Sequence, residues 1–459
     1  MDYKTFIEQK EQLKESTSII ARDDEINPML YDFQRVLLEW ALKKGRAAIY
    51  ADCGLGKTPL QLSWADVIVK RTNKPVLVLT PLAVSYQTVR EGEKFGIECI
   101  RSDNGEIKGK IIITNYERLH YFNKNSFIGV VCDESSILKH FTGSRQKEIT
   151  DFMKKIPYRL LCTATAAPND YYELGTSAEA LGVMGHMDML STFFKSDDNC
   201  MHIGRFKQSN LWWQQKWHFK AHAEIQFWKW VSSWARALRK PSDIGFSDER
   251  FILPPLQVEE TIVKASRPLN GNLFIEPAFN IKEQREERKM TIQPRCEEIK
   301  NKVNGTNSVV VWCQYNEEGD LLEKIIPDAQ QVKGADESEK KEELLLAFTN
   351  GTLRVLVTKP KIGAFGLNWQ HCNHMTFFPS HSFEQYYQGV RRCWRFGQKN
   401  SVKVDIITTE GEMRVLKNLQ RKEEAANKMY DMLVSTVNNA LILKHEENFN
   451  SIVEVPTWL

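Results

Sequence analysis

The amino-acid sequence predicts an α/β protein with two lobes, each built on a parallel β-sheet. Two series of short, apolar, β-branched segments alternate with helix-length segments, which is typical of buried parallel strands with helices on both faces. The first series comprises residues 47–51, 76–80, 110–114, 128–132 and 159–163. The second comprises residues 308–313, 353–358, 375–378 and 402–407.

A region of different character separates the two series, at about residues 180–255. It holds Trp212, Trp213, Trp217, Trp228, Trp230 and Trp234, interleaved with lysine, arginine and histidine. Such aromatics could stack on unpaired bases or separate strands. They could instead form the core of two packed helices. The helical spacing of Phe227, Trp230 and Trp234 favours the core interpretation, which we extend to Trp213 and Trp217.

The chain length of 459 residues suggests two or three domains. We expect an N-terminal extension at 1–25, a first lobe at 26–180, a helical Trp-rich insertion with a linker at 181–255, a second lobe at 256–425 and a helical tail at 426–459. A formal net charge of +3 shows no global basic excess, although a groove can still be basic.

The composition also indicates a compartment. Nine scattered cysteines without a CxxC pair are typical of reduced, intracellular thiols. The charged N-terminus does not resemble a secretory signal, and no apolar run has the length of a membrane span. We therefore expect a cytoplasmic protein that does not contact a membrane. The cluster from His371 to His374 lacks a second ligand pair at metal spacing, so we interpret it as loop or core.

Residues 51–58 read ADCGLGKT and follow a predicted strand directly. Gly54 and Gly56 would let the backbone wrap around an anion, and the N-terminus of the next helix would add amide donors. Lys57 would reach the β- and γ-phosphates, and the hydroxyl of Thr58 would bind Mg²⁺. A chance turn could carry the same residues, but the flanking strand and helix pattern favours a phosphate-binding loop.

Residues 130–134 read VVCDE, an apolar strand that ends in two acids. Such a pair could be a solvated strand end. Beside a phosphate loop, it is well placed for Asp133 to bind Mg²⁺ and for Glu134 to polarise the attacking water. The two motifs together predict a site for ATP and Mg²⁺.

Further motifs in order along the chain make it resemble a superfamily-two helicase, from about residue 28 to residue 425. The resemblance is to the Swi/Snf-like group of double-stranded DNA translocases, which have a DEAD/DEAH-type ATPase core of two RecA-like lobes with an ATP cleft between them. It implies that Gln34 reads adenine and that Thr80 and Pro81 contact a nucleic-acid strand. It also implies that Thr163 and Thr165 couple hydrolysis to movement.

The second lobe carries the remaining motifs of the resemblance. Residues 361–368 resemble the family's glycine-rich motif, which contacts both DNA and nucleotide. The resemblance implies that Gly366 binds nucleotide and that Lys361 and Asn368 bind nucleic acid. Gln388, Arg392 and Arg395 match the family's QxxxRxxR spacing, and residues 396–398 continue it in the Swi/Snf manner.

The two arginines of this last motif also have a physical rationale. A phosphoryl transition state needs positive charge near the γ-phosphate, and arginine supplies a fixed, always charged fork. If Arg392 and Arg395 lie on one helix, their spacing places them on one face, pointing across a cleft at ATP. With Arg391 they could otherwise form a surface basic patch, an interpretation that the first-lobe motifs disfavour.

The chain departs from the family at three positions. Ala51 replaces the usual first glycine of the loop, Ser136 lies where a histidine or aspartate is usual, and Lys361 replaces a frequent arginine. The insertions typical of chromatin remodellers look reduced to the Trp-rich region, so we expect a compact bacterial or bacteriophage-type member.

The leading functional hypothesis is an ATP-dependent motor that translocates on or remodels duplex DNA. A strand-unwinding helicase on DNA or RNA is the first alternative. A nucleotide-dependent nucleic-acid clamp with weak hydrolysis is the second.

Overall fold

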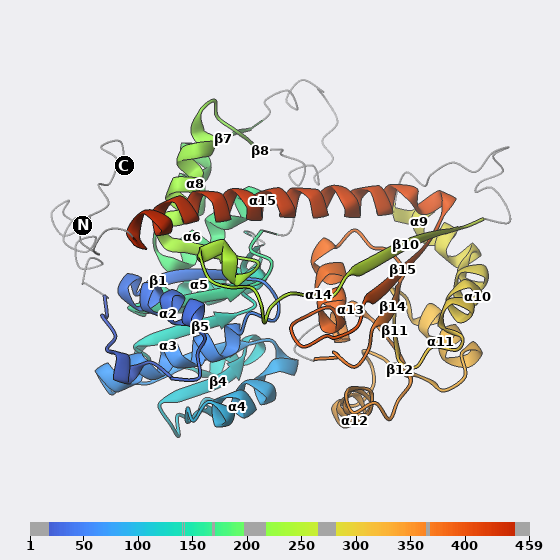
Figure 1. Ribbon diagram of the computed structural model, residues 1–459, viewed down its shortest axis with the longest axis horizontal. Coiled ribbons are helices and arrows are strands. Elements are labelled where there is room, and N and C mark those ends of the chain that lie inside the picture. The colour runs from blue at the N-terminus through green and yellow to red at the C-terminus, as the bar shows by residue number, and fades with distance from the viewer. Residues whose placement is uncertain are drawn as a thin grey trace.

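The computed structural model describes residues 18–139, 141, 143–167, 170–196, 217–264, 281–363 and 368–445. Within them the chain forms two α/β lobes on separate parallel sheets, which confirms the predicted fold class (Figure 1). Gly366, Trp212, Trp213 and the N-terminal extension up to residue 17 lie outside the described residues.

The first lobe contains a seven-stranded sheet whose neighbouring strands are all parallel. In spatial order its strands are β3 (Ile100–Arg101), β4 (Ile111–Asn115), β2 (Val76–Thr80), β5 (Gly129–Asp133), β6 (Tyr158–Thr163), β1 (Arg46–Ala51) and β9 (Ala235–Leu238). The five strands predicted in the first series each lie within one residue of the observed bounds. Because the strands are parallel, β1, β5 and β6 bring their carboxyl ends, and the motifs that follow them, to one edge.

Helices cover both faces of this sheet. One face packs against α2 (Asp32–Lys44), α3 (Lys57–Thr72) and α4 (Ser85–Lys94). The other packs against α5 (Ser144–Met153), α6 (Leu174–Leu181), α7 (His186–Phe193) and α8 (Ala223–Trp234). The helix α2 shows how the sequence sets such an element: its apolar side chains share one face, and Gly45 ends it with a φ of 67°.

The Trp-rich region is part of the first lobe's core. Phe227, Trp230 and Trp234 are buried along α8, which confirms the core interpretation for these three residues. Trp217 packs against the same cluster, but from a strand rather than from the expected second helix: β7 (Phe194–Ser196) and β8 (Trp217–Phe219) form an antiparallel pair. The chain leaving α8 then enters β9, which pairs with β1 at the edge of the main sheet.

The second lobe contains a six-stranded parallel sheet. In spatial order its strands are β10 (Leu256–Val263), β15 (Val402–Thr409), β14 (His374–Phe377), β11 (Val309–Trp312), β13 (Val355–Thr358) and β12 (Ala329–Val332). Four of them match the predicted second series. Among its helices are α9 (Ile281–Met290), α10 (Ile292–Val303), α11 (Asn316–Ile325), α12 (Ser338–Thr349), α13 (Pro360–Gly363) and α14 (Phe383–Cys393).

The helices α10 and α11 pack on one face of this second sheet, and α12 and α14 pack on the other. Ser382 caps α14 by accepting a hydrogen bond from the backbone N–H of Gln385, so the cap fixes where this helix begins. The α14 helix then runs along the side of the lobe that faces the first lobe (Figure 1).

A single helix, α15 (Met413–His445), spans both lobes. Leu416 belongs to the core of the second lobe, whereas Met429, Tyr430 and Leu433 are buried in the core of the first. Figure 1 shows the helix running across from one lobe to the other. Of the helices in the described part of the chain, none is both long and apolar enough to span a bilayer.

Candidate functional site

A cavity of about 380 Å³ lies between the lobes, a volume typical of small-molecule sites. It brings together most of the residues predicted to act on the nucleotide. From the first lobe these are Gln34, Gly54, Gly56, Lys57, Thr58, Asp133 and Glu134. From the second lobe they are Arg392 and Arg395. Residues separated by more than 300 positions therefore line one cavity.

The phosphate loop connects β1 to α3 and depends on two glycines with positive φ. Gly56 precedes α3 with a φ of 73°, and a Cβ there would lie 2.2 Å from Nε2 of Gln34. Gly54 has a φ of 90°, and a Cβ there would lie 2.9 Å from the backbone nitrogen of Phe396. Both residues thus need glycine for backbone conformation and for close packing, the second against the opposite lobe.

Lys57 and Gln34 hold the loop from within. The ammonium of Lys57 donates hydrogen bonds to the carbonyl oxygens of Ala51 and Asp52, at 2.9 and 3.3 Å. Gln34 is buried; its Nε2 donates to the carbonyl oxygen of Leu55 at 2.9 Å, and its Oε1 accepts from the N–H of Tyr31 at 3.0 Å. Gln34 therefore connects the start of α2 to the phosphate loop.

The acidic pair follows β5 at the same edge. Gln61, which the sequence analysis did not single out, donates to Oδ1 of Asp133 at 2.7 Å. Burial raises the pKa of Asp133 to about 6, and the negative charge of Glu134 acts in the same direction. A bound cation would favour the ionised carboxylate instead, so this site is suited to a divalent metal.

Glu134 adopts a φ of 52°, an uncommon left-handed conformation for a residue with a side chain. Its Oε2 accepts a hydrogen bond from the hydroxyl of Thr163 at 3.1 Å, and Nε2 of Gln388 lies 3.5 Å away. The N–H of Thr165 donates to the Thr163 hydroxyl oxygen at 3.0 Å. The acidic, coupling and arginine motifs therefore meet at one carboxylate.

The two predicted arginines reach the cavity differently from the expectation of a shared helix face. Arg392 lies on α14, where its Nη2 donates to Oε1 of Gln388 at 3.0 Å. Arg395 lies beyond the helix, which ends at Cys393. A separate segment rather than helical periodicity thus brings Arg395 to the same cavity.

The protein environment lowers the pKa values of both arginines. Burial lowers the pKa of Arg392, and burial together with the positive charge of Arg392 lowers the pKa of Arg395 to about 10. The Nε atom of Arg395 is shielded from solvent and has no hydrogen-bond partner among the described residues. Arg392 is buried and Arg395 is half-buried, and two such cations in a cavity lined by the phosphate loop provide a setting in which a polyanion would be stabilised.

Arg391 does not form the surface basic patch considered as an alternative. It is buried, and it pairs with Asp52 of the phosphate loop. The sequence offered no signal for this contact, because the two residues are 339 positions apart.

Aromatic side chains form another part of the wall that was not predicted. Phe251, from the segment between the lobes, contacts Phe396 with ring centroids 5.0 Å apart and Tyr31 at 5.2 Å. All three line the cavity. Together with Gln34, they give the cavity an apolar part beside the phosphate loop.

The residues predicted to contact nucleic acid are only partly accessible. Thr80 is fully buried, and its hydroxyl donates to the carbonyl oxygen of Thr114 at 3.4 Å. Pro81 is partly exposed and Lys361 is exposed, whereas Asn368 faces the nucleotide cavity.

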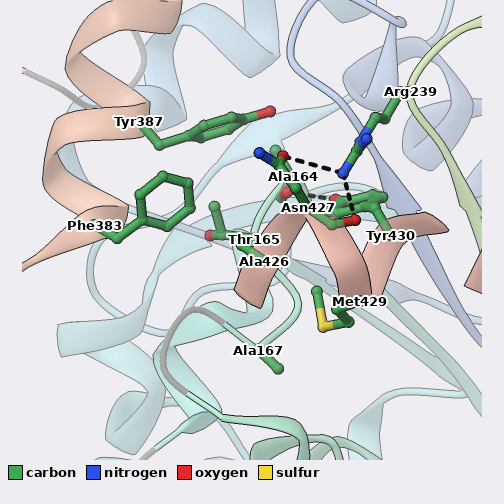
Figure 2. A pocket seen from close by; sticks show the side chains of 10 residues that line it. All are labelled: Ala164, Thr165, Ala167, Arg239, Phe383, Tyr387, Ala426, Asn427, Met429 and Tyr430. Atoms are coloured by element: carbon green, nitrogen blue, oxygen red, sulfur yellow. Dashed lines mark hydrogen bonds between the residues drawn. The ribbon is translucent and has the colours of Figure 1, made fainter. Parts of the chain in front are cut away.

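The coupling motif also contacts α15. Figure 2 shows a second cavity of about 30 Å³ beside it, lined by residues that include Thr165, Arg239, Tyr387 and Tyr430. The hydroxyl of Tyr430 donates to the carbonyl oxygen of Ala164, and Arg239 donates to the carbonyl oxygen of Asn427 at 2.9 Å. The helix from the second lobe is thus bonded directly to the coupling motif of the first.

Comparisons with known proteins give one family match, one relative and one solved structure. Residues 292–397 match the family described as helicase conserved C-terminal domain. The mouse (Mus musculus) protein named DNA annealing helicase and endonuclease ZRANB3 is 27% identical over 177 residues, covering 34% of this chain and 16% of that relative. A solved Sulfolobus solfataricus SWI2/SNF2 ATPase core in complex with dsDNA has 18% identity and a TM-score of 0.42, covering 94% of this chain and 98% of that chain.

Two parallel-sheet lobes that share one cavity between a phosphate loop and an arginine-bearing helix define the architecture of a helicase-type core. The family match and the mouse relative confirm the resemblance to superfamily-two helicases of the Swi/Snf-like group. The chain spans about a sixth of the length of the mouse relative that it matches.

Proposed function

We propose that this protein hydrolyses ATP in the interlobe cavity and uses the reaction to translocate on, or remodel, double-stranded DNA. The observation that carries the proposal is the composition of the cavity: the first lobe contributes Lys57 and Glu134, and the second contributes Arg392 and Arg395. Neither lobe holds the complete set, so hydrolysis would require the lobes to be together.

Each residue has a role suited to its position. Lys57 would release the loop carbonyls and bind the β- and γ-phosphates, while Gln34, Gly54 and Gly56 shape the loop around them. Mg²⁺, held by Thr58 and Asp133, would neutralise charge that develops on the phosphates. Gly366 is proposed, from the resemblance alone, to contact the nucleotide.

The attacking water would be oriented by Glu134, whose carboxylate is held by Thr163 and faces Gln388. Arg392 and Arg395 would stabilise charge on the transferring phosphoryl group. The aromatic residues that line the cavity would provide an apolar surface for the base. The site is therefore equipped for in-line hydrolysis of a nucleoside triphosphate.

Movement would follow from the sharing of this site between lobes. Loss of the γ-phosphate removes the anion that both arginines face, which favours separation of the lobes. Thr163 and Thr165 would transmit this change, because Thr163 bonds to Glu134, Thr165 bonds to Thr163, and Thr165 lines the small cavity beside the middle of α15. The predicted domain bounds remain our proposal, with one change: β9, which lies within the predicted insertion at 181–255, belongs to the first lobe's sheet.

Duplex DNA is the proposed track because the partial relative is named as a DNA helicase and the Arg392 motif resembles that of duplex translocases. Such motors grip backbone phosphates rather than bases. Pro81 and Lys361 are the accessible candidates for these contacts, together with Thr80 and Asn368 if the lobes rearrange.

The test is steady-state ATP hydrolysis at one fixed salt concentration with no nucleic acid, duplex DNA, single-stranded DNA or RNA. Strong stimulation by duplex DNA, followed by displacement of a third strand from a triplex, is the expected result. Stimulation only by single strands or RNA would favour the unwinding helicase. Binding without hydrolysis would favour the clamp. The Glu134→Gln variant should bind ATP without turnover and serves as the control for contaminating ATPases.

A further inference from the structure

A buried ion pair outside the nucleotide cavity connects the two lobes. Nη2 of Arg391 donates to Oδ2 of Asp52 and, at 3.2 Å, to the carbonyl oxygen of Cys53. The hydroxyl of Tyr387 donates to Oδ1 of the same aspartate. Both carboxylate oxygens of a phosphate-loop residue therefore accept hydrogen bonds from α14 of the opposite lobe.

Because this ion pair is largely buried, the loss of either partner would be energetically costly. The side chain of Arg391 is 4% exposed and that of Asp52 is 13% exposed. Removing one partner would leave the other charge buried and uncompensated, which is strongly unfavourable, whereas removing both charges avoids that penalty. Separation of the lobes would expose both groups to water, so the pair contributes only while the cleft is closed.

The position of Arg391 on α14 indicates that the ion pair with Asp52 controls the orientation of this helix. Glu384, Tyr387, Gln388 and Arg391 follow the i, i+3, i+4, i+7 spacing of one helix face. Each contacts the first lobe: Glu384 pairs with Lys139, Tyr387 and Arg391 bind Asp52, and Gln388 faces Glu134. Because Arg392 follows Arg391 directly, docking on Asp52 fixes the rotation of the helix that carries Arg392.

We propose that Asp52, Tyr387 and Arg391 form an interlobe latch that positions α14 on the phosphate loop and thereby sets Arg392 for catalysis. Asp52, Tyr387 and Arg391 are not among the residues that line the nucleotide cavity, so they act as positioning residues rather than on ATP itself. The inference rests on the proposed function and adds residues that the QxxxRxxR motif does not include.

The latch predicts a specific kinetic signature. Arg391→Met and Asp52→Asn should each lower kcat for duplex-stimulated hydrolysis by about ten- to a hundredfold, the range expected when a catalytic group is slightly misplaced. KM for ATP should change by less than about threefold, because the groups that bind ATP in the first lobe remain. The double variant should lose less than the product of the two single effects.

Arg288 offers a matched control within the second lobe. Its guanidinium donates to the carboxylate of Glu412 and to the carbonyl oxygen of Pro379 at 2.9 Å, the same donor pattern as Arg391, with a side chain 11% exposed. Arg288→Met should lower the thermal unfolding midpoint while leaving kcat of the folded protein within about threefold. An equal fall in kcat for this control would overturn the positioning role.

A measurement that does not use ATP separates this proposal from the proposed function. In small-angle X-ray scattering of the full chain, latch variants should have a larger radius of gyration than the wild type, and Arg288→Met should not. If the wild type hydrolyses no ATP but the latch variants expand, the function fails and the latch stands. If hydrolysis is normal and neither kcat nor the radius changes, the latch is refuted. Should Arg391→Met fail to fold, Tyr387→Phe removes one donor without altering charge and is tested identically.

Discussion

Replacing Arg392 with alanine removes one of the two arginines through which the second lobe lines the cavity. In the folded protein its Nε and Nη2 donate to the backbone oxygen and Oε1 of Gln388, at 3.2 and 3.0 Å. Its own carbonyl oxygen accepts from the N–H of Trp369 at 2.9 Å, a backbone contact that alanine retains. The loop that precedes β14 should therefore stay in place, and the principal loss is positive charge at the phosphates.

The expected loss in kcat can be placed within a range. Arginines that stabilise phosphoryl transfer contribute factors of about 10³–10⁵ to kcat, which correspond to about 4–7 kcal/mol at 1.36 kcal/mol for each tenfold step. Arg395 lines the same cavity and retains part of the charge, so we expect the lower end, about 10³. Affinity for ATP should fall much less, since the first lobe holds the phosphate loop.

The assay is single-turnover hydrolysis with saturating duplex DNA, alongside equilibrium binding of a fluorescent ATP analogue. Arg392→Lys retains the charge without the planar fork and should fall between the wild type and the alanine variant. A decrease in hydrolysis below tenfold, or one fully accounted for by weaker ATP binding, would refute the assignment of Arg392 to the transition state.

Three further outcomes follow from other contacts. Thr163→Val removes the hydroxyl that holds Glu134, and should reduce triplex displacement per ATP hydrolysed more than hydrolysis itself; an equal fall in both would contradict a coupling role. Trp228→Ala should cost about 3–5 kcal/mol of unfolding free energy in urea because the side chain is fully buried, and weaker binding to single strands at unchanged stability would restore the stacking interpretation. Burial raises the pKa of Asp405, but His374 and two lysines outweigh burial and lower this pKa to about 2. The ionised carboxylate therefore stabilises the folded protein fully above about pH 4, the pKa of an unfolded aspartate. This stabilisation is lost as the pH falls through 2. Asp405→Asn should therefore flatten acid unfolding over that interval, and an unchanged profile would count against the pairing.

The sequence predicted best the parts of the fold that are apolar and buried. The segments that form β2, β5 and β6 are five or six residues long and mainly apolar, a pattern that predicts a buried strand. The edge strands β10 and β12 were missed because they hold glutamine and glutamate and β10 is largely exposed. The edge strand β9 was absorbed into the Trp-rich region because it directly follows α8.

The cavity residues were predictable where a local pattern carries the chemistry, as in the glycines and Lys57 of the phosphate loop. Contacts made across the cleft were not. Asp52 and Arg391 have no short-range signature, and Gln61 looks like an ordinary helix residue until Asp133 is placed beside it. Arg395 reaches the cavity from beyond a helix end, a geometry that periodicity cannot describe.

The helix α15 limits how the cleft can open. The polypeptide passes between the lobes at residues 253–255 and again along α15, whose first turns pack into the second lobe's core and whose middle packs into the first lobe's core. Because both attachments lie on one side, the lobes can rotate about the line that joins the attachments. The same two attachments resist sliding and complete separation of the lobes. Figure 1 shows α4 and α12 on the side away from this line, so opening of the lobes would move these two helices the farthest. A rotation about this line would therefore move the far rim of the lobes more than it moves the side on which they are joined.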